Sequence, residues 1–149
     1  MYLERLEDLS IYYWLVDKFS STPFVKIVDG FPVEDLTIPS ISIEQDELEN
    51  YPLQLGDRKG GSIRTWYIDV FAKNKSLRDE FAYKVYNDLK DGITIYDYNT
   101  GFSNPSSIGH LDIQYKKIQI IRIDPELISP LYYRAQLTIL AENVILEDD

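Results

Sequence analysis

Residues 62–92 constrain the fold of this chain more than any other segment, because a strand pattern gives way there to a helix pattern. The run SIRTWYIDVFA at 62–72 is rich in the β-branched and aromatic residues that strands favour. In KSLRDEFAYKVYNDLKDG, at 75–92, apolar residues recur at three- and four-residue intervals, which indicates one face of a helix. Ser76 is the predicted N-cap of this helix and Gly92 its predicted end. The apolar positions are Leu77, Phe81, Ala82, Val85, Tyr86 and Leu89.

The remaining segments add one helix and five strands to this unit. The helix covers 2–19, and its predicted apolar face comprises Tyr2, Leu6, Leu9, Tyr13 and Val16. The predicted strands are 24–28, 36–47, 93–98, 108–124 and 131–144, with long loops at 46–61 and 99–107 and a hairpin turn at 125–130. This order predicts a single domain, 1–149, of the α+β class. We expect a mostly antiparallel or mixed β-sheet, an N-terminal helix and a central helix packed on one face, and a long closing β-hairpin.

Apolar side chains change sides along the predicted strand 108–124. Leu111, Ile113 and Tyr115 occupy odd positions and Ile118 and Ile120 even ones, and the later Ile121 and Ile123 are odd again. A strand that is apolar on both faces needs cover on both faces, and the N-terminal helix or a neighbouring subunit would provide it. In the last strand Leu131, Tyr133, Ala135, Leu137 and Ile139 all face one way, toward the expected core.

Composition excludes several classes of protein. The formal charge is −10, from 25 acidic and 15 basic residues, which argues against a general binder of the phosphate backbone. The absence of cysteine removes disulfides and thiolate chemistry, and the single histidine, His110, cannot form a three-histidine zinc site. The acidic start MYLERLEDLS does not resemble a signal peptide, and no apolar run approaches the roughly 20 residues that span a bilayer. We therefore expect a soluble, non-secreted protein that contacts no membrane.

Three segments could carry chemistry, but each has a simpler explanation. GDRKGGS at 56–62 lacks the lysine of a phosphate-binding loop and precedes a strand rather than a helix. His110 lies near Asp97 and Asp112 in the sequence, so an acid–base or metal site is conceivable, although a polar surface residue is the simpler interpretation. EQDELE at 44–49 lacks calcium-loop spacing and reads as a solvated acidic edge. We assign no catalytic, cofactor-binding or metal-binding residue and expect no cofactor.

Asp69 is the most informative polar residue, because it falls in the middle of a strand. It shares a side with Tyr67 and Phe71, and a carboxylate there is costly unless it is paired. Arg64 and Arg134 are the available partners, in a structural ion pair, in a pair across a subunit interface, or in a catalytic arrangement. The 12 tyrosines fit either an interface or a half-buried strand surface. The residues predicted to make subunit contacts are Tyr67, Asp69, Phe71, Tyr132 and Arg134.

The order of elements resembles the tail-terminator (tail-completion) proteins of tailed bacteriophages. The resemblance rests on SIRTWYIDVFAKNKSLRDEFAYKVYNDLKDGITIYDYN at 62–99 and on the closing segment YYRAQLTILAENV. The N-terminal helix and the long loop 46–61 also fit, so the pattern covers most of the chain.

This resemblance implies a non-enzymatic structural protein of the virion. Its copies would form a ring, usually a homohexamer, that caps the tail tube and joins it to the neck. The implied partners are other copies of itself, the tail tube protein, neck or head-completion proteins and the sheath protein. The protein would be made in the cytoplasm of the bacterial host, and its loops 46–61 and 99–107 would face the tube or the neck.

The charge suits such a ring. Six copies at −10 each would carry about −60, and an acidic lumen would let DNA pass without specific binding. Two alternatives remain. Another head–tail connector or neck-completion protein could share this architecture, and a small-ligand-binding or enzymatic domain would show a pocket that gathers His110, Asp97 and Asp112.

Overall fold

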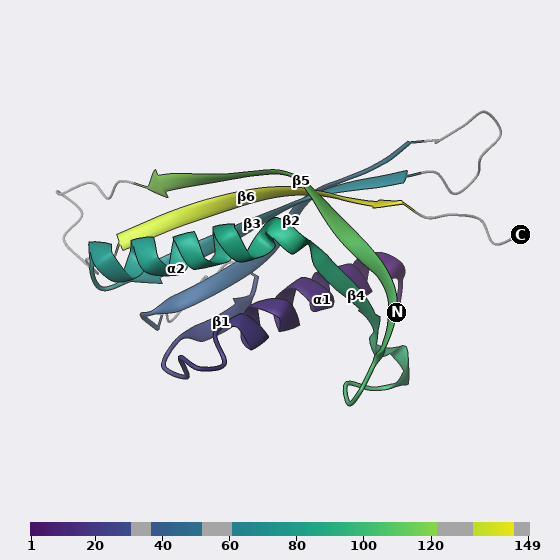
Figure 1. Ribbon diagram of the computed structural model, residues 1–149, viewed down its shortest axis with the longest axis horizontal. Coiled ribbons are helices and arrows are strands. Elements are labelled where there is room, and N and C mark those ends of the chain that lie inside the picture. Colours follow the sequence, from purple (N-terminus) through teal and green to yellow (C-terminus); the bar gives the residue numbers. More distant parts are fainter. Residues whose placement is uncertain (31–36, 52–60, 122–132, 145–149) are drawn as a thin grey trace, which may run out of the picture.

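The chain folds around one curled sheet of six strands, with both α-helices on the same side of it (Figure 1). The computed structural model describes residues 1–30, 37–51, 61–121 and 133–144. The strand order is β1-β2-β3-β6-β5-β4, in which β1 runs parallel to β2 and all other neighbours are antiparallel. The predicted α+β class, with two helices on one face of a mixed sheet and long C-terminal strands, is therefore confirmed.

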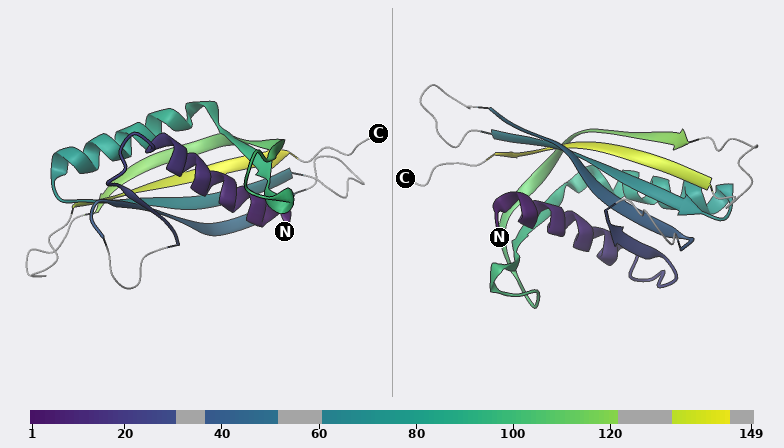
Figure 2. Two further views of the ribbon diagram at one scale, coloured as in Figure 1. Left: turned by 90° about the horizontal axis from the view of Figure 1, so that it is seen from below. Right: turned by 180° about the vertical axis from the view of Figure 1, so that it is seen from behind.

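The strands differ greatly in length. The short strands are β1 (Lys26–Asp29) and β4 (Ile93–Asp97). The longer strands are β2 (Ser40–Tyr51), β3 (Gly61–Ala72) and the two C-terminal strands β5 (Ser106–Ile121) and β6 (Tyr133–Val144). β5 bridges two parts of the sheet, because its first residues pair with β4 and its later residues pair with β6. Its first part curls away from the rest of the sheet toward α1 (Leu3–Lys18) (Figure 2).

The hydrophobic core lies between the sheet and the helices α1 and α2 (Lys75–Asp88). Alternation along β3 and β6 sends one set of side chains to this core face. The fully buried members from the sheet include Ile41, Trp66, Ile68, Val70, Leu137 and Ile139. The helices contribute Ile11, Leu15, Phe81 and Val85, and the short 3₁₀ helix η1 (Leu89–Asp91) contributes Leu89. We call the opposite side of the sheet, away from the helices, the outer face.

A β-bulge explains why the apolar residues of β5 change sides. Ile113 pairs with Ala141 and Tyr115 pairs with Leu140, so Gln114 is an extra residue in the ladder. The extra residue shifts the alternation by one position. Ile113 before the bulge and Ile118 after it therefore both pack against the core.

The predicted apolar face of α1 is only partly correct. Leu6 and Leu9 are buried, but Tyr2, Tyr13 and Val16 are exposed, and Ile11 and Leu15 are fully buried in their place. Glu7 and Asp8, which the apolar pattern places outside the core, are buried as well. The helix is rotated because these two carboxylates meet a buried arginine of β3, as described below.

Other local predictions also change. Asn74, not Ser76, caps α2: its side-chain oxygen accepts a hydrogen bond from the Leu77 amide at 2.8 Å, and the helix begins at Lys75. Gly92 ends the η1 turn as predicted. Tyr133, expected in the core, is exposed at the start of β6.

The predicted loops are shorter than expected. β2 continues to Tyr51, because 48–51 pair in register with the start of β3 after a bulge between Gln45 and Leu48. The 3₁₀ helix η2 (Tyr98–Thr100) occupies the start of the predicted loop 99–107, and β5 begins at Ser106. Residues 52–60 and the predicted hairpin turn 125–130 lie outside the described residues. Among the helices that the structure describes, none has the length and apolar character needed to cross a bilayer.

Candidate subunit interface

The outer face of β3 and β6 carries four of the five residues predicted to make subunit contacts. Tyr67, Asp69 and Phe71 alternate along β3, and Arg134 lies opposite Phe71 on β6. The fifth, Tyr132, lies outside the described residues. The structure thus brings four of the predicted residues onto one surface, and their contact with another subunit stays a prediction.

Asp69 is paired within its own chain. Its Oδ1 accepts hydrogen bonds from Nε of Arg134 at 2.9 Å and from Nη2 at 2.8 Å. Asp69 is almost fully buried, whereas the Arg134 side chain keeps 22% of its surface exposed. Of the two partners considered from the sequence, Arg134 makes this pair, because Arg64 projects from the opposite face of β3. The geometry matches the structural ion pair considered for Asp69.

The neighbours of this pair reinforce it. The Arg134 guanidinium lies 5.5 Å from the centre of the Phe71 ring, a distance at which cation and ring attract each other. Phe71 is itself buried, and the buried side chains of Ser40 and Ser42 lie opposite Phe71 and Asp69 on β2. Tyr67 is half-buried and donates its hydroxyl to Oδ2 of Asp46 at 3.1 Å.

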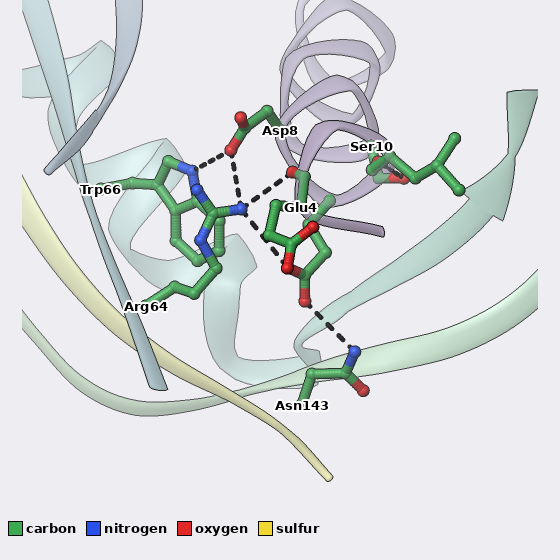
Figure 3. Close-up of polar contacts among 8 residues, drawn as sticks. Glu4, Asp8, Ser10, Arg64, Trp66 and Asn143 are labelled. Carbon is green, nitrogen blue, oxygen red and sulfur yellow. Dashed lines mark hydrogen bonds and ion pairs between the residues drawn. The ribbon is translucent and has the colours of Figure 1, made fainter. Parts of the chain in front are cut away.

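Arg64 organises a second polar cluster, on the core face beneath α1 (Figure 3). Its Nη1 lies 2.9 Å from Oδ1 of Asp8 and 3.3 Å from Oε1 of Glu7. Nη1 also donates to the backbone carbonyl of Glu4 at 2.9 Å. The guanidinium stacks over the Trp66 ring at 4.5 Å. This arginine therefore ties the first two turns of α1 to β3.

The carboxylates of the Arg64 cluster have further partners. Asp8 Oδ1 accepts a hydrogen bond from the Trp66 indole at 2.9 Å, and Glu7 Oε2 accepts one from Asn143 Nδ2 at 3.2 Å. Burial raises the pKa of the Glu7 carboxyl above its ordinary value, and the attraction of Arg64 opposes this rise without cancelling it. Each charge of the cluster contacts an opposite charge.

A hollow of about 420 Å³ lies between α1 and the β4–β5 region. Tyr13, Trp14 and Tyr98 line it, and Asp17, Asp91 and His110 also contribute to its wall. The two carboxylates considered from the sequence are not part of this lining. Asp97 accepts a hydrogen bond from the Asn99 amide. Oδ1 of Asp112 lies 3.8 Å from Nε2 of His110, and both of these side chains are exposed. In the described part of the chain, no group of three or more His, Cys, Asp or Glu side chains is placed to hold a metal ion.

An aromatic cluster borders this hollow. Tyr98 and Phe102 stack at 5.4 Å, and Tyr13 of α1 lies 5.4 Å from Tyr98 and 5.9 Å from Phe102. Tyr98 is buried, and this burial raises the pKa of its hydroxyl. Phe102 is 58% exposed, which leaves a flat aromatic surface at this end of the molecule.

A further exposed region is the second half of β5. Tyr115 and Ile120 expose 53% and 42% of their surface there, and Lys117 and Gln119 between them are exposed as well. The change of sides of the apolar residues was the signal in the sequence, and the bulge accounts for the change between Ile113 and Ile118. Tyr115 pairs with Leu140 and Ile120 with Ala135, so the first side chain lies on the outer face and the second on the helix side of the strand.

No protein-family model matches the chain. No curated protein matches it either.

Proposed function

We propose that this chain is a structural virion protein, a tail terminator whose copies form a ring that caps the tail tube and joins it to the neck. The observation that carries the proposal is the second half of β5, where Tyr115 on the outer face and Ile120 on the helix side are both exposed, so this border of the sheet presents apolar side chains on both of its faces. Such a surface suits protein assembly better than catalysis.

The order of elements gives further support. The unit β3–α2–β4 and the long closing strands β5 and β6 form the core of the fold, and these are the segments on which the resemblance to tail terminators rests. The arginines at the two polar clusters are engaged in structural ion pairs with buried carboxylates, as expected of a scaffold. The partners under this proposal are sister copies, the tail tube protein, the sheath protein and the neck or head-completion proteins.

The net charge supports the same function. A homohexamer would carry about −60, and acidic side chains around its lumen would repel the DNA backbone and let the genome pass without specific binding. Another head–tail connector protein would share these features but would bind the portal side rather than the end of the tube.

Polymerising tail tubes provide the test. Tube protein assembled without the chain should give a broad distribution of lengths, whereas adding the chain before polymerisation should shorten and narrow that distribution. Labelled chain should appear at tube ends only in electron micrographs. Unchanged tube lengths, with no labelled ends, would reject the terminator function, and binding to the portal side alone would favour the connector alternative.

The hollow between α1 and β4 supports a second candidate, a small-ligand-binding domain. It offers aromatic walls together with the carboxylates of Asp17 and Asp91, which suit a small organic cation. Nuclear magnetic resonance titration with a library of amines would test it. Shifts confined to Tyr13, Trp14 and Tyr98 at low ligand concentration would support binding, and no shifts would remove this candidate.

A further inference from the structure

Two strands of the sheet have an edge that, over part of its length, pairs with no other described strand. β1 pairs with β2 only from Ser40 to Ile43, and β4 pairs with β5 only from Ser106 to Leu111. We call the backbone of 44–51 on the side away from β3 the β2 edge, and the backbone of 112–121 on the side away from β6 the β5 edge. Among the described strands none pairs with either edge, and β5 lies along the border of the sheet (Figure 1).

The two edges carry opposite charge. Glu44 and Asp46 are exposed on the β2 edge, and Lys117 is exposed on the β5 edge. Lys116 lies on the helix side of the same strand, where its Nζ donates to the Tyr86 carbonyl at 2.6 Å. Free edges present rows of backbone N–H and C=O groups that can pair with another strand, and natural proteins often use lysine there to prevent pairing with the wrong one. Lys117 on the β5 edge opposes contact between two β5 edges, but it favours contact with an acidic strand.

The strand directions allow this contact. β2 is antiparallel to β3, β3 is antiparallel to β6, and β6 is antiparallel to β5. β5 therefore runs opposite to β2. A rotation about an axis parallel to the strands leaves the direction of every strand unchanged. β5 of one copy would therefore meet β2 of the next copy in antiparallel orientation.

The register also matches. Lys117 pairs with Thr138, Thr138 pairs with Tyr67, and Tyr67 pairs with Glu44, so these four residues form one row across the sheet. Directly opposed residues of antiparallel strands share a face of the sheet. Glu44 and Lys117 therefore lie at the same level, on the outer face, at the two opposite free edges. Rotation of the copy would place Lys117 of one subunit beside Glu44 of the next.

We propose that copies of this chain join by antiparallel pairing of the β5 edge of one subunit with the β2 edge of its neighbour, with Lys117 beside Glu44. The two surfaces differ, so the contact is head-to-tail, and such a contact produces a ring where the rotation closes. The inference names the contact within the ring of the proposed function and rests on that proposal for ring closure.

Disulfide trapping tests this contact directly, because the chain contains no native cysteine. In the double variant Glu44→Cys/Lys117→Cys, the two cysteines of one chain are separated by three strand spacings, about 14 Å, which is too far for a disulfide within the chain. Mild oxidation of the double variant should therefore give a ladder of multimers on non-reducing gels, ending in a closed species. Each single-cysteine variant should stay monomeric on the same gel.

The two single variants also identify a wrong geometry. A dimer from Lys117→Cys alone would mean that two β5 edges meet, and a dimer from Glu44→Cys alone would mean that two β2 edges meet. Either result would overturn the proposal, as would the absence of a ladder from the double variant across a concentration series. Circular dichroism of each variant establishes that it folds.

Charge exchange gives a second measurement by sedimentation velocity. Lys117→Glu and Glu44→Lys should each weaken self-association roughly tenfold, and the double exchange should restore it. Lys90→Glu, an equal change of charge at the exposed η1 turn, is the matched control and should leave association unchanged. Equal weakening by Lys90→Glu, or no recovery in the double exchange, would overturn the pairing.

Tube capping separates this inference from the proposed function. Shortened tubes without a cysteine ladder would leave the terminator function standing and remove the edge pairing. A ladder without any effect on tube length would support the edge pairing and count against the terminator function.

Discussion

Arg134 holds Asp69 with two hydrogen bonds to a single carboxylate oxygen, from Nε at 2.9 Å and from Nη2 at 2.8 Å. The two residues belong to neighbouring strands, β6 and β3, and lie two register positions apart, on the same face of the sheet. The pair therefore crosses the sheet diagonally and fixes the outer face at the point where Asp69 is buried.

Removing the arginine should be costly, because it leaves a buried carboxylate without its cation. Arg134→Ala should lower the free energy of unfolding by about 2–4 kcal/mol. This loss is smaller than that expected for a fully buried ion pair, because water partly screens the exposed Arg134 side chain. Urea unfolding followed by tryptophan fluorescence measures this change. Arg5→Ala is the matched control: its ion pair with Asp29 at 3.3 Å is exposed, so its loss should cost less than about 1 kcal/mol. Equal effects of the two variants would contradict the structural role assigned to Arg134.

The Glu7 carboxyl should make stability depend on pH in a defined direction. Burial raises its folded-state pKa above the ordinary 4.5, so the folded chain holds this proton more tightly than the unfolded chain does. The resulting stabilisation is complete below pH 4.5 and is lost as the pH rises through the raised pKa. The stability of the wild type relative to Glu7→Gln should therefore fall over that window and level off above it. Parallel urea titrations of both proteins at several pH values measure the difference, and a relative stability that rises with pH would contradict this account.

The orientation of α1 yields a third prediction. Leu15→Ala should cost about 2–5 kcal/mol, because Leu15 is fully buried and the substitution leaves a cavity. Val16→Ala, its neighbour on the exposed side of the helix, should cost less than about 1 kcal/mol. Thermal and urea unfolding of the two variants distinguish this orientation from the one predicted by apolar spacing, which would require the larger loss at Val16.

The sequence predicted the class of fold because its strongest signals are local. Alternation along 62–72 and 131–144 and the spacing of apolar residues in 75–92 each depend on neighbours a few residues away. The rotation of α1 depends on Arg64, which lies 57 residues from Glu7 along the chain. Apolar spacing alone cannot anticipate that a distant buried arginine will draw two carboxylates into the core.

The candidate interface was predictable only in part. The alternation of side chains along β3 correctly placed Tyr67, Asp69 and Phe71 on one face. The need for a cation beside Asp69 made Arg134 one of its two candidate partners, and Arg134 is the partner observed. The free edges could not be predicted, because an edge is defined by which strands pair and over what length. The β5 bulge at Gln114 was equally hidden, since nothing about a glutamine marks the extra residue.

Gly92 provides a final prediction, because both its backbone and its surroundings exclude a side chain. Its φ is +71°, and a Cβ there would lie 2.5 Å from the carbonyl oxygen of Leu111. Gly101 also has a positive φ, +121°, but a Cβ there would meet no atom within 4 Å, so it is the matched control. Gly101→Ala should cost about 1–3 kcal/mol from backbone strain alone. Gly92→Ala should cost clearly more, since a clash with the β5 backbone adds to the strain and loosens the contact between η1 and β5. Urea unfolding of the two variants measures the difference, and equal losses would show that β5 yields to the added methyl group without cost.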